Sequence, residues 1–137
     1  MKINQDLVRT IQECWNKDTS ADPENWSPKN PAYGHCDITS VLIRDYYGGE
    51  ILYSYVKEPN GNKTAHFYNR IDNKIIDLTK SQFDERTKIT HGFPITGQFL
   101  NTRQYIMSLK NNQKRYTTLR NRVENLEKGN FSIKLKR

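Results

Sequence analysis

The sequence predicts an α+β fold, in which helices pack against a small antiparallel sheet. Three observations predict it. Apolar residues repeat with helical spacing in segments on both sides of the middle of the chain, strand-like segments occupy residues 51–79, and short turn dipeptides separate those segments. The expected order is two helices, a three-stranded β-meander and then further helices.

Length and composition indicate one small polar domain over residues 1–137 with an aromatic-weighted core. Hydrophobic residues make up 34% of the chain and aromatic residues 11%. No apolar run reaches membrane-spanning length, and the start of the chain is too polar for a signal peptide. Its two cysteines give neither a disulfide framework nor a CxxC metal spacing. We therefore expect a cytoplasmic protein that contacts no membrane and holds no cofactor or metal.

Two helices are expected before the sheet. The first covers residues 4–16, and its apolar face consists of Leu7, Ile11, Cys14 and Trp15, so Cys14 is expected in the core. Residues 16–34 contain three prolines and are typical of a long ordered loop. The second helix covers Cys36 to Tyr47 and ends at Gly48, and its buried stripe consists of Ile38, Val41, Leu42 and Tyr46.

The strands are expected at Ile51–Lys57, Lys63–Ile71 and Lys74–Thr79. Asn60-Gly61 predicts the first hairpin turn, because this dipeptide adopts positive φ readily. Asp72-Asn73 predicts the second for the same reason. The segment that follows is expected to be a loop, and helices are expected over residues 103–109 and 112–127.

Cys36 lies where the second helix begins. A thiolate at a helix N-terminus is stabilised by unpaired backbone N–H groups and by the helix dipole, which lower the thiol pKa. Gly34 before it allows a sharp turn. A single cysteine entering a helix is also commonly a packing residue, so position alone leaves both interpretations open.

The register of the two hairpins adds a second observation. A two-residue turn at Asp72-Asn73 pairs Ile71 with Lys74, which places His66 and Asp77 as diagonal neighbours on one face of the sheet. The same counting around Asn60-Gly61 places Tyr55 opposite His66. Thiol catalysis needs a thiol, an imidazole that takes its proton and a carboxylate that orients the imidazole, so Cys36, His66 and Asp77 are the candidate catalytic residues.

Four stretches of the chain resemble a known family: "NPAYGHCDITSVLIRDYYGGEIL", "HFYNRI", "IDLTKSQF" and "RYTTLRNRV". They are similar in order and spacing to the YunG-like family of small, uncharacterised bacterial proteins, from about Trp15 to Val123. A helix-opening cysteine followed by a histidine and an aspartate on successive strands also resembles the papain-like and transglutaminase-like cysteine hydrolase superfamily. The resemblance implies a papain-like fold and a cysteine-dependent hydrolase or acyl transferase. Its substrate would be a protein or a small amide or ester, and peptidase, deamidase and transglutaminase-like reactions all stay open.

Two residues depart from the family pattern. The family reads Gly-Gln-Cys-Ala where this chain has Gly34-His35-Cys36-Asp37. In papain-like enzymes a glutamine commonly helps the backbone N–H of the cysteine to bind the oxyanion, and here His35 or Asn30 is the candidate donor. Asp37 places a negative charge beside the thiol and is expected to raise its pKa.

Three aromatic residues, Trp26, Tyr33 and Tyr55, are candidates for the walls of a substrate groove, with core packing as the other interpretation for Trp26. A zinc site built from Cys36, His35 and His66 lacks ligand-pair spacing, so no metal site is predicted.

The last quarter of the chain carries the whole excess of positive charge. Residues 102–137 hold ten Lys/Arg against two Asp/Glu, in a protein of net charge +7. The alternative function is therefore a non-catalytic binding protein that engages an acidic protein or a nucleic acid through this basic region. Its contact residues would be Lys114, Arg115, Arg120 and Arg122, although a solvated helix face explains the same charges.

Overall fold

The computed structural model describes residues 3–135, with side chains through residue 129. The fold is α+β, as predicted. The helices are α1 (Gln5–Cys14), α2 (Cys36–Tyr47), α3 (Thr102–Ser108) and α4 (Asn112–Leu135), and the strands are β1 (Glu50–Lys57), β2 (Lys63–Ile71), β3 (Lys74–Ile76) and β4 (Lys88–Ile89). Three single-turn 3₁₀ helices lie in the connections: η1 (Lys17–Thr19), η2 (Pro23–Asn25) and η3 (Lys80–Gln82).

The helices of the N-terminal half start and stop at residues whose chemistry explains the boundary. Asn4 caps α1, because its side-chain oxygen accepts hydrogen bonds from the backbone N–H groups of Asp6 and Leu7. Helix α2 begins at Cys36 and ends at Gly48, which has a φ of +79°, a conformation that favours glycine. The predicted bounds of α2 are therefore confirmed.

The sheet has the order β3-β2-β1-β4 and is antiparallel throughout. Asp72 and Asn73 both have positive φ, which is the geometry of a two-residue hairpin turn, and Ile71 pairs with Lys74 as predicted. The meander β1-β2-β3 is therefore confirmed, but β3 ends at Ile76 and not at the expected Thr79, so Asp77 directly follows the strand. The strand β4, within a segment expected to be a loop, pairs with the outer edge of β1.

The predicted register of the first hairpin is wrong by one residue. Ser54, and not Tyr55, pairs with His66, and Tyr55 pairs with Ala65. The cause is the turn: Glu58 and Asn62 close it by the hydrogen bond from Glu58 N to Asn62 O, so three residues lie between them in place of the expected two. Because a shift of one residue moves a side chain to the other face, Tyr55 lies on the face opposite to His66.

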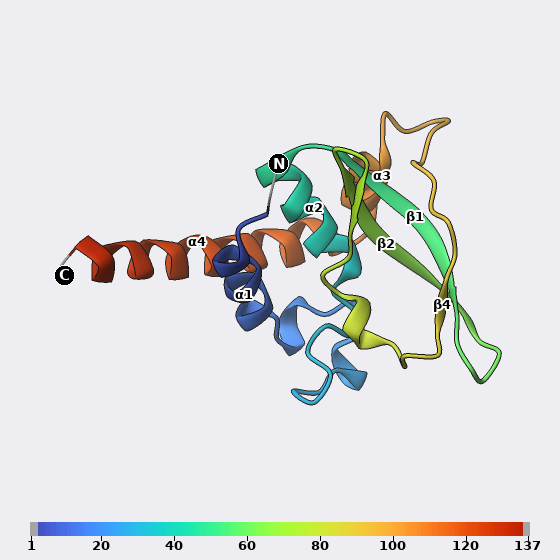
Figure 1. The fold of residues 1–137 in the computed structure, drawn as a ribbon, viewed down its shortest axis with the longest axis horizontal. Coiled ribbons are helices and arrows are strands. Elements are labelled where there is room, and N and C mark those ends of the chain that lie inside the picture. The colour runs from blue at the N-terminus through green and yellow to red at the C-terminus, as the bar shows by residue number, and fades with distance from the viewer. Residues whose placement is uncertain (1–2, 136–137) are drawn as a thin grey trace.

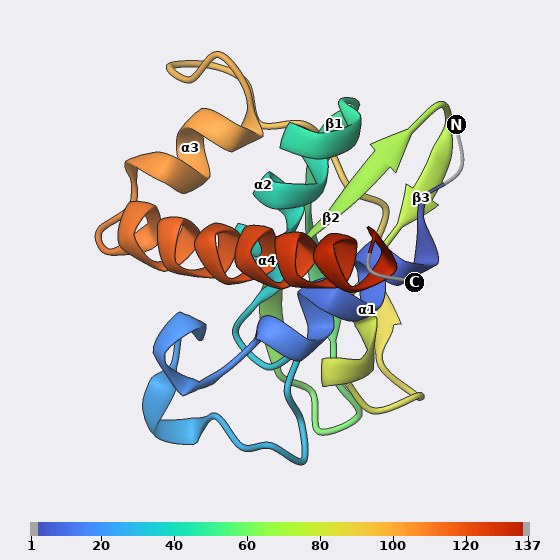
Figure 2. The same ribbon diagram turned by 90° about the vertical axis from the view of Figure 1, so that its left-hand side faces the viewer.

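Helix α2 lies at the centre of the molecule, packed on β2 on one side and on α4 on the other (Figure 1). In Figure 2 α4 runs across the front, with α2 and α3 on one side of it and α1 on the other. The core lies between these layers, and its fully buried members include Ile11, Ile38, Leu42, Ile106 and Leu119. Cys14 belongs to this core, as predicted.

Within residues 3–135 no helix is both long enough and apolar enough to cross a membrane.

Candidate functional site

The turn before α2 delivers Cys36 to the helix N-terminus, and Gly34 makes this turn possible. Gly34 has a φ of +76°, and a Cβ on it would lie 2.1 Å from Ser20 Oγ and 2.9 Å from Ala21 N. Its carbonyl accepts a hydrogen bond from Ala21 N at 2.9 Å, which ties the turn to the N-terminal loop. Only glycine fits this position, so the local sequence fixes where α2 begins.

The thiol of Cys36 is half-buried against β2. The backbone N–H of Phe67, the residue after His66, donates a hydrogen bond to it. Burial nevertheless raises the pKa of Cys36 to about 12, and the charge of Asp37 acts in the same direction. The expected lowering of this pKa by the helix N-terminus is therefore wrong, because desolvation outweighs the dipole. At rest Cys36 is a neutral thiol.

His66 and Asp77 form the pair that the hairpin register predicts. The distance from His66 Nε2 to Asp77 Oδ2 is 2.7 Å, and the histidine side chain is fully buried. The second carboxylate oxygen, Asp77 Oδ1, accepts a longer hydrogen bond from Thr79 Oγ1. The ring of Phe83 contacts the imidazole edge to face, with centroids 5.1 Å apart. These contacts hold the imidazole in one orientation.

The other imidazole nitrogen, His66 Nδ1, is buried and has no hydrogen-bond partner within the described residues. Because a carboxylate accepts but does not donate, the Nε2 nitrogen facing Asp77 carries the proton. In the neutral imidazole the Nδ1 nitrogen is then an unprotonated acceptor. A buried imidazole nitrogen left unpaired is unfavourable, and an unprotonated imidazole nitrogen is the group that proton abstraction requires.

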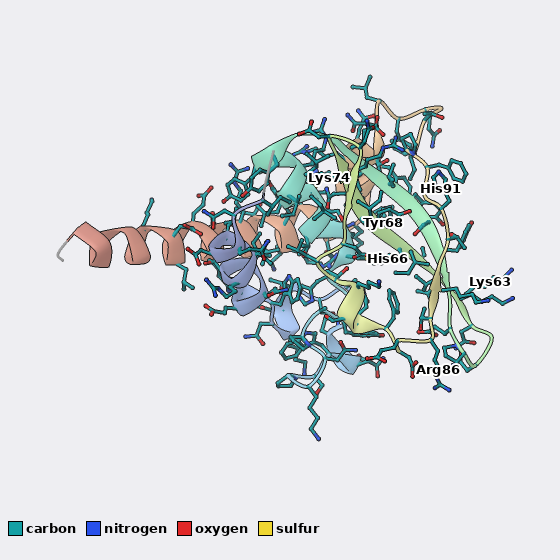
Figure 3. All side chains as sticks on the ribbon, viewed as in Figure 1. Lys63, His66, Tyr68, Lys74, Arg86 and His91 are labelled. Atoms are coloured by element: carbon teal, nitrogen blue, oxygen red, sulfur yellow. The ribbon has the colours of Figure 1, made fainter. Side chains whose placement is uncertain are left out.

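Figure 3 shows His66 and Tyr68 inside the molecule on β2, whereas Lys63, Arg86 and His91 lie at its periphery. His91 is exposed, and its ring contacts only Phe93 among the aromatic residues. Of the two histidines outside the N-terminal loop, His66 is therefore buried beside Asp77, whereas His91 lies at the surface.

Arg115 of α4 lies beside this site, and the sequence did not reveal this role. Its guanidinium donates to both carboxylate oxygens of Asp37, at 2.8 and 3.0 Å, so the charge next to Cys36 has a direct counterion. The spacing of Arg115 carried a signal. It precedes Leu119 by four residues and Val123 by eight, so it continues the buried seam of α4, where a charged residue needs an internal partner.

His35 and Asn30 make their side-chain hydrogen bonds within the protein. The imidazole of His35 is fully buried, with Nε2 2.7 Å from Thr19 Oγ1 and Nδ1 2.9 Å from Tyr33 O, and it stacks on Trp15. Burial lowers the pKa of His35 to about 4. Asn30 Nδ2 donates to Gln82 O at 3.0 Å. Both side chains therefore hold the N-terminal loop in place through these hydrogen bonds.

The three predicted groove residues are not brought together. Trp26 Nε1 donates to Pro31 O, and Tyr33 Oη donates to Asp22 Oδ2 at 2.6 Å, so both are held within the N-terminal loop. Tyr55 is 52% exposed and lies on the opposite face of the sheet from His66.

Most of the predicted basic contact residues pair with acids of this chain. Besides the Arg115–Asp37 pair, Arg120 Nε donates to Glu124 at 2.9 Å and Arg122 pairs with Asp18. Lys114 is exposed. The basic residues beyond 129 lie outside the described side chains. The guanidinium groups of these three arginines therefore each have a carboxylate partner within this chain.

No group of three His, Cys, Asp or Glu side chains that would suit a metal ion occurs in the part of the chain that the structure describes. A hollow of about 420 Å³ opens beside Asp77 and Phe83. Its lining includes neither Cys36 nor His66.

The family described as "YunG protein" matches residues 4–128. A protein of Bacillus subtilis (strain 168), "Uncharacterized protein YunG", is 30% identical over 81 residues, which cover 59% of this chain and 64% of that relative. The match therefore spans less than two thirds of the relative's length. No solved structure matches the chain, so no structural neighbour bears on the papain-like relationship.

Proposed function

The chain belongs to the YunG protein family, and on that premise we propose that it is a cysteine-dependent hydrolase or acyl transferase acting on an amide or ester carbonyl. In this proposal Cys36 is the nucleophile, His66 is the general base and then the general acid, and Asp77 orients His66. The observation that carries the proposal is the buried His66 Nδ1 atom, which has no partner within the described residues while Nε2 is held by Asp77.

The first half of the reaction follows from these assignments. His66 Nδ1 accepts the proton of the Cys36 thiol as Sγ attacks the carbonyl carbon of the substrate. The backbone N–H of Cys36 stands at the first position of α2 and has no partner within the helix, so it is available to the developing oxyanion. The tetrahedral intermediate then collapses, and the leaving amine or alcohol takes the proton from His66. A thioester on Cys36 remains.

The second half reverses the roles. Water, or an amine in acyl transfer, attacks the thioester carbonyl while His66 Nδ1 accepts its proton, and the thiolate leaves and regains that proton. Peptidase, deamidase and transglutaminase-like reactions share this thioester and differ in the leaving group and the second nucleophile. A papain-like or transglutaminase-like relationship accords with the order Cys36, His66, Asp77 along the chain.

The raised pKa of Cys36 shapes the mechanism. A thiol with a pKa of about 12 carries almost no thiolate at neutral pH, so a preformed thiolate is not the attacking species. Deprotonation must accompany attack, and it depends on the base. The proposed mechanism is therefore general-base catalysis by His66, which makes His66 indispensable for reactivity.

Trapping of the acyl-enzyme tests the proposal. The protein is mixed with p-nitrophenyl acetate, and intact mass spectrometry followed by peptide mapping locates any acetyl group. We expect acetylation of Cys36, ahead of buried Cys14, and its loss in Cys36→Ala and His66→Ala. Acetylation of lysines alone, equal in all three proteins, would overturn the proposal.

A further inference from the structure

The guanidinium of Arg115 joins α4 to the turn that carries Cys36. Besides Asp37, it donates to the carbonyl of Gly34 at 2.8 Å, to the carbonyl of Thr19 at 2.9 Å and to Asn112 Oδ1 at 2.8 Å. Its partners come from the N-terminal loop, the start of α2 and the start of α4. One buried side chain therefore fixes three segments that meet beside the nucleophile.

This ion pair differs from the others on α4. The side chains of Arg115 and Asp37 are 9% and 14% exposed, whereas those of Arg122 and Asp18 are 37% and 57% exposed. Exposed ion pairs contribute little to stability, and apolar residues often replace buried ones without loss. Stability alone is therefore a weak reason for a buried guanidinium at this position.

The charge of Arg115 also reaches the thiol. Asp37 raises the pKa of Cys36 and Arg115 lowers it, so the two residues act in opposite directions on the same group. The other groups that face Cys36 are the carboxylate of Asp77, which raises its pKa, and the backbone N–H of Phe67, which lowers it. The pair thus places a carboxylate beside the thiol together with the cation that offsets it.

We propose that Arg115 is a positioning residue for Cys36: it holds the turn that presents the thiol and offsets the charge of Asp37 as the thiolate forms. This inference rests on the proposed function, since it concerns the nucleophile of that reaction. It gives α4, the basic helix, a role inside the site and separates Arg115 from Lys114, Arg120 and Arg122.

The test uses four proteins of residues 1–137: the unmodified chain, Asp37→Asn, Arg115→Gln and the double variant. Alkylation of Cys36 by iodoacetamide is followed by mass spectrometry from pH 6 to pH 9.5. Loss of the carboxylate favours the thiolate, so Asp37→Asn should react faster below the thiol pKa, by about three- to tenfold. Arg115→Gln leaves Asp37 unopposed and should react slower by a similar factor. The double variant should return close to the unmodified profile.

Melting temperatures and the control Arg122→Gln separate this role from a structural one. A role in stability alone would lower the melting temperature of Arg115→Gln and leave the four pH profiles superimposed, which would overturn the inference. If Arg115→Gln does not fold, Asp37→Asn and Arg115→Lys decide. If the alkylation rates of Asp37→Asn equal those of the unmodified chain at every pH, the inference is refuted. Faster alkylation of Asp37→Asn, together with near-normal rates for the charge-preserving Arg115→Lys, supports it.

The outcome also distinguishes the two proposals. If His66→Ala leaves Cys36 reactivity unchanged, the proposed function fails. If His66→Ala abolishes it while the charge variants react alike, the proposed function stands and the role of Arg115 fails.

Discussion

Replacing Asp77 by asparagine tests the orienting carboxylate without changing its shape. In the structure Asp77 Oδ2 lies 2.7 Å from His66 Nε2, and the two side chains are 10% and 0% exposed. The carboxylate can only accept, so it holds the proton on Nε2. An asparagine amide can instead present its NH₂ group to the ring, because Thr79 Oγ1 on the other side both donates and accepts.

With the amide nitrogen facing the imidazole, Nε2 must accept and the proton moves to Nδ1. That tautomer blocks the nitrogen which takes the thiol proton. With the amide oxygen facing it, a charged hydrogen bond becomes a neutral one. A hydrogen bond to a charged group contributes about 1.5–3 kcal/mol and a neutral one about 0.5–1.5 kcal/mol, so about 1–1.5 kcal/mol is lost. Cys36 should then be acylated about 5- to 13-fold more slowly, and more slowly still in the tautomer that blocks Nδ1.

The assay is the rate of Cys36 acetylation by p-nitrophenyl acetate, with the tautomer of His66 read from its ¹⁵N chemical shifts. Asp84→Asn is the matched control, because Asp84 is a more exposed carboxylate in the same segment, paired with Arg86. A normal rate in Asp77→Asn with an unchanged His66 tautomer would refute the assignment of Asp77, whereas slowing in Asp84→Asn would show a general effect of charge.

Three further predictions concern the framework of the site. Gly34→Ala should destabilise the fold by about 2–4 kcal/mol in urea unfolding, because the added Cβ meets Ser20 and the backbone has positive φ; an unchanged midpoint would contradict this. The free energy of unfolding should fall by about 2–3 kcal/mol as the pH drops from about 6.5 to about 4, because His35 takes up a proton at higher pH in the unfolded chain than in the folded one. His35→Gln should remove this contribution to the pH dependence of stability. An unaltered pH dependence in that variant would show that His35 is not its source. Arg122→Gln should change the free energy of unfolding by no more than about 1 kcal/mol, since its ion pair with Asp18 is exposed, and a larger loss would mean that the pair is more important than its exposure indicates.

Local chemistry allowed most of the fold to be predicted. Glycine at position 48 ends α2, and two residues that tolerate positive φ at 72 and 73 set the second hairpin. That hairpin alone places His66 and Asp77 on one face, so this pair was predictable from the sequence. The prediction succeeded because a two-residue turn leaves one register open.

The other features of the fold and the site depend on contacts that no local sequence pattern encodes. The first turn contains Asn60-Gly61 but closes one residue wider, which moves Tyr55 to the other face. The partner of Asp37 lies 78 residues away at Arg115, and only packing of α4 against the start of α2 brings them together. The pKa of Cys36 depends on burial by several segments, and the helix-dipole argument did not include that burial.

If His66 activates Cys36, the rate of Cys36 alkylation by iodoacetamide at pH 7 depends on the imidazole. The folded protein is compared with His66→Ala, with buried Cys14 in the same molecule as the internal reference. A thiol with a pKa of about 12 needs a base, and a positioned base contributes about a hundredfold or more, so His66→Ala should lower the rate at Cys36 at least about tenfold while Cys14 is unaffected. Equal rates at Cys36 in the two proteins would contradict the claim.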